Sequence, residues 1–342
     1  MPLADQTTGD GKVMAQERRG WLQGVIRRLR LASGLVMFAY VTTHFVNHSL
    51  GLISVEVMDH ALERIYQYWA SPLGGVILYG AFATHYGLAL WALWLRRSLR
   101  MPVAEATQLV LGFLIPFFLT DHVLQTRVAD TFYGAYYGHF ATVLYTYFVA
   151  NPLRGGLQFI VLVIAWIHAM IGLWFWLRLK PWYQRWQPIL YAFALLMPTL
   201  AILGVFEGGR EVMARAGDPA WVAQLAQAHP RAAPADAAVI DQMVVWMRYA
   251  FLAALLAVLA ARVARWHWER RRGVIRLTYP SGRVVAIVHG VSVLEARSYG
   301  AGGGVVAPSS LDQPMEVPRG ASERSKPFYC CFRAVEHAGC GD

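Results

Sequence analysis

Five histidines lie within or at the edge of the long apolar stretches of this chain: His44, His48, His85, His122 and His168. Four of them, His44, His85, His122 and His168, fall on four successive stretches at intervals of 41, 37 and 46 residues. An ionisable or metal-binding side chain is costly inside a bilayer and usually marks a functional site. Two pairs of imidazoles that face each other across a helix bundle are what bis-histidine haem iron requires. The spacing therefore predicts a membrane protein in which these four histidines are metal ligands.

These histidines need membrane-spanning helices to hold them, and the composition supplies such helices. The chain of 342 residues is 56% hydrophobic and only 15% charged. About 20 apolar residues suffice to cross a bilayer as a helix. Uncharged runs that reach this length are 31–53, 71–95, 155–177 and 186–206, and shorter apolar runs are centred within 106–125 and 243–261. The sequence therefore predicts an all-α membrane protein, a bundle of six transmembrane helices.

Charged residues at the ends of the spans predict their orientation. Arginines gather before position 31, after 95, after 177 and after 261, whereas most acidic residues lie in the loops at the opposite ends. The positive-inside rule then places both termini in the cytoplasm, as in a multi-pass protein of a cytoplasmic membrane. The net charge of +10 is mostly explained by these rim arginines. No nucleic-acid partner is expected, because the basic residues form no single soluble patch.

The depth of each histidine can be estimated by counting from the charged rim. His85 lies 11 residues before Arg96, and His168 lies 10 residues before Arg178. At 1.5 Å per helical residue, both are roughly 15–16 Å from the inner rim. His44 and His122, counted from Arg30 and Glu105, are about 21 and 25 Å deep. The sequence therefore predicts an inner pair on the second and fourth spans and an outer pair on the first and third.

Other residues are candidates for holding the cofactor. His48 is four residues from His44 and shares its helix face, so either could ligate iron. Gly172, four residues after His168, would leave room for a porphyrin ring. Arg127 and Arg248 at the outer margin are candidate propionate partners, with arginines 28, 97 and 178 as the inner alternatives. Two haems are expected, of the non-covalent b type, because the chain has no C-x-x-C-H motif.

The chain changes character after the sixth span. We expect a cytoplasmic basic N-terminus over 1–30, the haem domain over 31–263 and a basic linker over 264–273. Alternating residues in 274–279 and 283–288, around a Pro-Ser-Gly turn, predict a short β-hairpin that opens a further segment ending at 296. The remaining stretch, 297–342, is rich in glycine and proline and predicts a disordered or aberrant tail.

Several motifs resemble those of known families. The segment from 31 to 177 resembles the dihaem cytochrome b anchor of succinate dehydrogenase and fumarate reductase, in which histidines on four successive helices ligate two haems. The first histidine of its first-helix motif ligates there, which favours His44 over His48. The order of elements over roughly 20–296 is more similar to the membrane sensor region of bacterial class III adenylate cyclases. The motifs that carry this resemblance are 44–52 (HFVNHSLGL), 99–102 (LRMP), 165–168 (AWIH) and 175–183 (FWLRLKPWY).

The resemblance implies a six-helix sensor followed by a [2Fe–2S] ferredoxin-like domain and a cyclase domain, and here the sequence departs from it. The three cysteines, at 330, 331 and 340, do not have the spacing of a plant-type cluster, so no [2Fe–2S] cluster is expected. No cyclase catalytic domain is recognisable, and the change at Arg297 suggests a truncated or frameshifted product.

The resemblance and the histidines together favour a redox or quinone sensor, or an electron-transfer module, as the input half of a cyclase-like signalling protein in a bacterial inner membrane. Quinone and a second copy of the chain are candidate partners. The alternatives are the membrane anchor subunit of a quinone-linked oxidoreductase and a haem-free transporter. No catalytic domain is evident, so whether the chain acts as an enzyme stays open.

Overall fold

A computed structural model describes residues 6–135, 139–271, 274–278 and 284–288. The tail over 297–342, with its cysteines, and the whole segment 289–296 lie outside the described residues. The described chain forms two units, which divide between Trp268 and Glu269, within the stretch expected to be a basic linker. Each unit is described by itself.

Six helices are long and apolar enough to cross a bilayer, which makes this a multi-pass membrane protein and confirms the six predicted spans. They lie in α1 (Gln6–Ser49), α3 (Pro72–Leu95), α4 (Val103–Val123), α7 (Pro152–Leu177), α8 (Tyr183–Arg215) and α10 (Pro234–Arg271). Shorter helices are α2 (Val55–Trp69), α5 (Ala129–Tyr133), α6 (Phe140–Tyr145) and α9 (Pro219–Ala228). Single turns follow α1 at Leu50–Leu52, α4 at Leu124–Val128 and α6 at Thr146–Ala150.

Several helices begin at a polar residue followed by proline. The side chains of Ser71, Asn151 and Asp218 each accept a hydrogen bond from a backbone N–H in the first turn of α3, α7 and α9. The next residue in each case is proline, whose fixed φ suits the first helical position and whose missing N–H would have no partner there. These local signals set where α3, α7 and α9 start.

The third span is longer than the sequence suggested. Helix α4 continues through the wide turn Leu124–Val128 into α5, so that one apolar rod runs from Val103 to Tyr133. It ends at Gly134, whose φ of +61° is the left-handed conformation that commonly closes a helix. The helix continues this far because no glycine or proline occurs between Val123 and Gly134.

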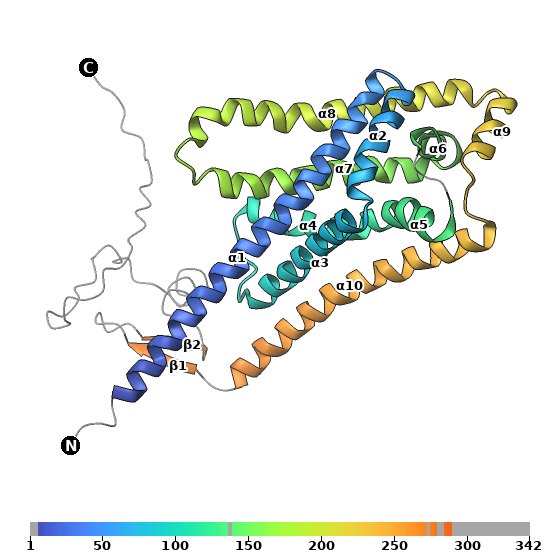
Figure 1. Ribbon diagram of the computed structural model, residues 1–342. Coiled ribbons are helices and arrows are strands. Elements are labelled where there is room, and N and C mark those ends of the chain that lie inside the picture. Colours follow the sequence, from blue (N-terminus) through green and yellow to red (C-terminus); the bar gives the residue numbers. More distant parts are fainter. Residues whose placement is uncertain (1–5, 136–138, 272–273, 279–283, 289–342) are drawn as a thin grey trace, which may run out of the picture. The chain divides into compact units, whose positions relative to one another are not determined.

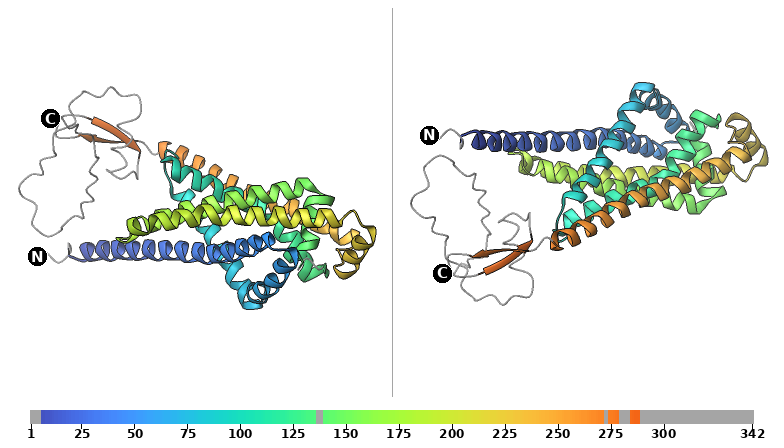
Figure 2. Two further views of the ribbon diagram at one scale, coloured as in Figure 1. Left: turned by 90° about the horizontal axis from the view of Figure 1, so that it is seen from above. Right: turned by 90° about the horizontal axis from the view of Figure 1, so that it is seen from below.

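The long helices of the first unit lie side by side, and α2, α5, α6 and α9 gather at the end where α1 finishes (Figure 1). Helix α1 packs against α3 and α8, and α4 packs against α7. Two further views show the same lengthwise packing of α1, α7 and α8 (Figure 2). Many apolar side chains on these helices face outward, such as Val76 at 72% and Leu195 at 71% exposure. Outward apolar side chains are expected where lipid is the solvent.

The second unit contains two described strands, β1 (Val274–Thr278) and β2 (Val284–Val288). They pair in the antiparallel sense, with Val274 opposite Val288 and Thr278 opposite Val284. Their assignment to a ferredoxin-like start stays a prediction.

Candidate functional site

The inner histidines face each other from α3 and α7. The ring centres of His85 and His168 are 6.3 Å apart, and their planes are inclined by 80°. His85 Nδ1 lies 3.2 Å from the carbonyl oxygen of Arg30 on α1, and His168 Nδ1 lies 2.8 Å from that of Gln108 on α4. A carbonyl oxygen can only accept a hydrogen bond, so each Nδ1 carries the proton. This tautomer leaves both Nε2 lone pairs available to a metal.

The outer histidines face each other from α1 and α4. The ring centres of His44 and His122 are 5.9 Å apart, with an interplanar angle of 63°. His122 Nδ1 lies 3.2 Å from the hydroxyl oxygen of Tyr147 in the turn after α6. The ring of His44 stacks on that of Tyr40 at 5.6 Å. One nitrogen of the His122 imidazole therefore has a partner, but this partner is a hydroxyl, which can donate or accept, where each inner histidine faces a carbonyl.

His48 lies beside the outer pair. Its ring centre is 4.4 Å from that of His44, and its ring also contacts Phe45 and Phe140. Its Nδ1 is buried and makes no hydrogen bond to any described residue. A buried imidazole nitrogen without a partner is costly, so His48 is a second candidate ligand at this level.

Both pairs can be tested against the dimensions of a bis-histidine site. A metal–imidazole bond is about 2.0 Å long in zinc sites, and the bonded nitrogen lies about 1.1 Å from the centre of its ring. Two rings on opposite sides of one metal ion therefore have centres about 6.2 Å apart. The observed separations of 6.3 and 5.9 Å are close to that value. The ring-centre separations are therefore compatible with one metal ion between each pair.

The remaining predicted residues have protein partners. A Cβ on Gly172 would lie 2.8 Å from Nε2 of Gln108, so this glycine makes room for the Gln108 side chain. Arg127 donates hydrogen bonds to the hydroxyl of Tyr66 and the carbonyl of Ala70, both at 2.8 Å. Arg248 Nε donates to the carbonyl oxygen of Phe117 at 3.1 Å. Arg127, in the turn after α4, thus contacts the α2–α3 turn, and Arg248 joins α10 to α4.

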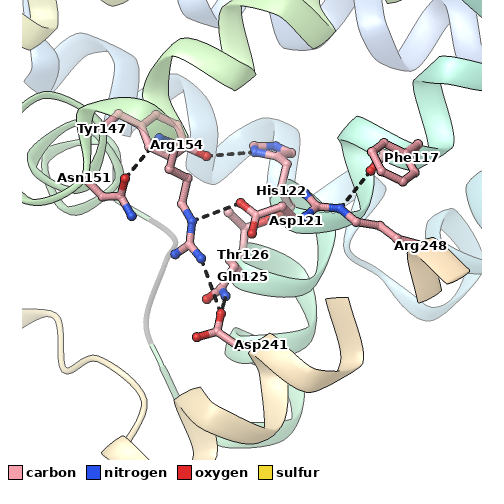
Figure 3. Close-up of polar contacts among 10 residues, drawn as sticks. All are labelled: Phe117, Asp121, His122, Gln125, Thr126, Tyr147, Asn151, Arg154, Asp241 and Arg248. Atoms are coloured by element: carbon pink, nitrogen blue, oxygen red, sulfur yellow. Dashed lines mark hydrogen bonds and ion pairs between the residues drawn. The ribbon is translucent and has the colours of Figure 1, made fainter. Parts of the chain in front are cut away.

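A polar network at the outer end of α4 was not recognised in the sequence (Figure 3). Arg154 Nε lies 3.1 Å from a carboxylate oxygen of Asp121, and its Nη2 lies 3.3 Å from Asp241 on α10. Gln125 also donates to Asp241, at 2.6 Å. Asp121 directly precedes His122 in the sequence. Arg154 could have been found, because it lies three residues after Asn151, at the outer start of the span that follows.

This network borders a small, shallow recess that is partly open at the surface. Tyr147 joins it to His122. The residues that line it are Gln125, Thr126, Val143, Thr146, Tyr147 and Arg154. A molecule bound in this recess would therefore be linked through the hydroxyl of Tyr147 to His122, a candidate metal ligand.

A second polar cluster lies outside the spans and had no predicted role. Asp59 on α2 accepts hydrogen bonds from Nδ1 of His139 at 2.8 Å and from the backbone N–H of Phe140 at 2.5 Å. The ring of His229 stacks on that of His139 with centres 4.0 Å apart. Burial raises the pKa of Asp59 above its ordinary value. Burial also lowers the pKa of His229, and the nearby His139 adds to this effect.

The geometry can be set against known proteins. Comparison with protein-family models, with curated proteins and with solved structures finds no match to this chain.

Proposed function

We propose that this chain is a membrane protein that binds two b-type haems and passes electrons across the bilayer, as the input half of a redox-sensing protein. The observation that carries the proposal is the pairing of imidazoles from non-adjacent spans. His85 meets His168, and His44 meets His122, at separations suited to one metal ion between each pair. Haem bound in this way supplies one-electron redox chemistry without an open coordination position, which favours electron transfer over oxygen binding.

The two levels lie along the bundle axis. His168 packs against Gly112 on α4, and His122 is 10 residues further along the same helix. At 1.5 Å per residue, the two levels are separated by about 15 Å. The chain's own helices therefore hold the two ligand pairs one above the other, which suits transfer between the two faces of a membrane.

In this proposal, a redox partner that diffuses in the membrane contacts the edge of the outer recess. The recess is lined in part by Tyr147, Gln125 and Arg154, whose side chains carry a hydroxyl, an amide and a guanidinium group. These groups can hydrogen-bond a quinone carbonyl or quinol hydroxyl and can hold a proton at the oxygen of that partner. Tyr147 links this position to His122. A quinone that docks here would exchange electrons with the outer level first.

A haem-free transporter is the second candidate, and the ion pair of Asp121 with Arg154 favours it. Ionisable residues near the end of a membrane helix often mark a substrate or proton path. That function would need no metal between the histidines.

The deciding experiment measures haem in the purified full-length chain. We expect a reduced-minus-oxidised spectrum of b type and a pyridine haemochrome ratio of two haems per chain. The exposed His60, which contacts only Glu56 on its own helix among the described ion pairs, provides a control variant, His60→Ala, that should keep both. A colourless protein, expressed with an ample supply of haem, would overturn the proposal and favour the haem-free transporter.

A further inference from the structure

The two inner histidines are held by the same local arrangement on two different helices. On α1, the carbonyl of Arg30 lies by His85, and a Cβ on Gly34 would lie 3.2 Å from Cε1 of that ring. On α4, the carbonyl of Gln108 lies by His168, and a Cβ on Gly112 would lie 2.8 Å from its Cε1. In both helices the glycine is four residues after the carbonyl.

This offset has a physical reason. In an α-helix the carbonyl of residue i points along the axis toward residue i+4. A side chain at i+4 would therefore cover the approach to that oxygen from outside the helix. Glycine at that position leaves the oxygen open to an imidazole from a neighbouring helix.

The correspondence extends to the outer ligands. His44 is 10 residues after Gly34, and His122 is 10 residues after Gly112. All three positions of α1 recur in α4 after the same offset of 78 residues, since 108−30, 112−34 and 122−44 are equal. The two glycines also face the same kind of partner, a histidine on the long helix that packs beside them.

We propose that α1 with α3 and α4 with α7 are two copies of one ligand-holding unit, and that Gly34 and Gly112 are positioning residues for the inner pair. Each copy gives one outer ligand from its first helix and one inner ligand from its second. The carbonyl and glycine of the first helix fix the tautomer and the ring orientation of the second helix's histidine. This inference rests on the proposed function, because it assigns the purpose of the arrangement to metal ligation.

One residue breaks the repeat. Ser33 Oγ lies 3.3 Å from Nδ1 of His85, in addition to the carbonyl of Arg30. The corresponding position on α4 is Leu111, which has no hydroxyl. His85 thus has two acceptors for its N–H where His168 has one. A second acceptor makes the imidazole a more basic ligand, which favours the oxidised iron.

The test uses the full-length chain and reads each haem by redox titration and by the electron paramagnetic resonance of its low-spin iron. In Gly112→Ala we expect binding of the inner haem to weaken about tenfold, the low end of what loss of an outer-shell contact costs. The haem ratio should then fall from two toward one, with the outer signal unchanged. Gly34→Ala should show a smaller effect, because its contact is longer.

The matched control is Gly87→Ala. Gly87 is two residues from His85 on α3, and a Cβ there would meet nothing within 4 Å, so both haems should stay as in wild type. Ser33→Ala removes only a hydroxyl and should raise the midpoint potential of the inner haem alone. If Gly112→Ala loses both haems through misfolding, the haem ratio of Gly34→Ala and the midpoint potential of Ser33→Ala test the positioning roles.

Failure of the proposed function and failure of the positioning roles give different results. A wild-type protein without haem overturns the proposed function. A wild-type protein with two haems, in which the Gly34, Gly112 and Ser33 variants behave like Gly87→Ala, overturns the positioning roles and leaves the function standing.

Discussion

Gly204 of α8 touches the backbone of α1 directly: a Cβ atom placed on Gly204 would overlap the carbonyl oxygen of His48. Gly51, in the turn after α1, makes the reciprocal contact with the carbonyl of Gly204. Small residues let helices approach this closely in a membrane, where packing replaces the hydrophobic effect between helices. The contact fixes α8 against the part of α1 that carries His44 and His48.

Gly204→Ala should therefore push α8 away from α1 at the outer level. Overpacking of this kind costs about 1–3 kcal/mol, so we expect a lower melting temperature in detergent. The outer haem should be perturbed before the inner one. Gly156→Ala on α7, where a Cβ would meet nothing within 4 Å, is the control. Equal melting temperatures for the two variants would contradict the prediction.

Histidine variants should sort the two haems into pairs. His85→Ala and His168→Ala should each remove the same haem, because one ligand alone does not hold a bis-histidine iron. His122→Ala should spare that haem and remove the other. Spectra and haem-to-protein ratios of the three purified variants check this. A loss of different haems in His85→Ala and His168→Ala would show that these rings do not share an iron.

The choice between His44 and His48 is open to a direct test. The ring of His44 lies 5.9 Å from that of His122, which is close to the separation of two axial ligands, so His44→Ala should lose the outer haem. His48→Ala should keep both haems and shift only the outer potential, because the ring of His48 adjoins that of His44. Redox titration of both variants distinguishes the roles, and the reverse pattern would make His48 the ligand.

Removal of Arg154 should destabilise the protein more than an exposed arginine does. The side chain of Asp121 is 11% exposed and that of Arg154 is 27% exposed. Breaking a buried pair leaves an uncompensated charge, and we expect a loss of about 3 kcal/mol for Arg154→Ala, the low end of the usual range. The double variant Asp121→Asn with Arg154→Gln should recover most of this loss.

The control for that prediction is Arg215→Ala. Its pair with Glu211 is formed within one helix, and the Arg215 side chain is 58% exposed, so its loss should cost less than about 1 kcal/mol. Denaturant or thermal unfolding in one detergent gives all four values. Similar losses for the two arginines would mean that Asp121 is solvated.

The extramembrane histidine cluster should make stability depend on pH. The pKa of His229 in the folded protein is below its ordinary value of 6.5, so the folded state binds fewer protons than the unfolded state. The contribution of His229 to the free energy of unfolding is present above pH 6.5 and is lost as the pH falls through the lowered pKa. Asp59 has the opposite effect on stability at lower pH, because burial raises its pKa above 3.8 and the folded state then binds more protons than the unfolded state.

Melting temperatures of wild type and His229→Gln between pH 7.5 and 5 test this effect. The wild type should lose stability faster than the variant on acidification, since protonation places a charge beside the ring of His139. Parallel pH profiles for the two proteins would show that His229 does not contribute.

The sequence was sufficient to locate the six candidate spans and to predict a depth for each histidine. Apolar runs show where each span lies, and the rise per residue of a helix converts a count from Arg96 or Arg178 into a predicted depth. The serine, asparagine and aspartate residues that precede prolines mark where α3, α7 and α9 begin. All of these are local properties, and they depend on residues that are close together along the chain.

Only the tertiary structure decided which groups face each histidine. The carbonyls of Arg30 and Gln108, the hydroxyl of Tyr147 and the partnership of Asp121 with Arg154 each join helices that are distant in sequence. In water an amphipathic stripe would indicate which side of a helix turns inward. In a bilayer the lipid-facing and protein-facing sides are both apolar, so the rotation of each helix is set by its packing against the others.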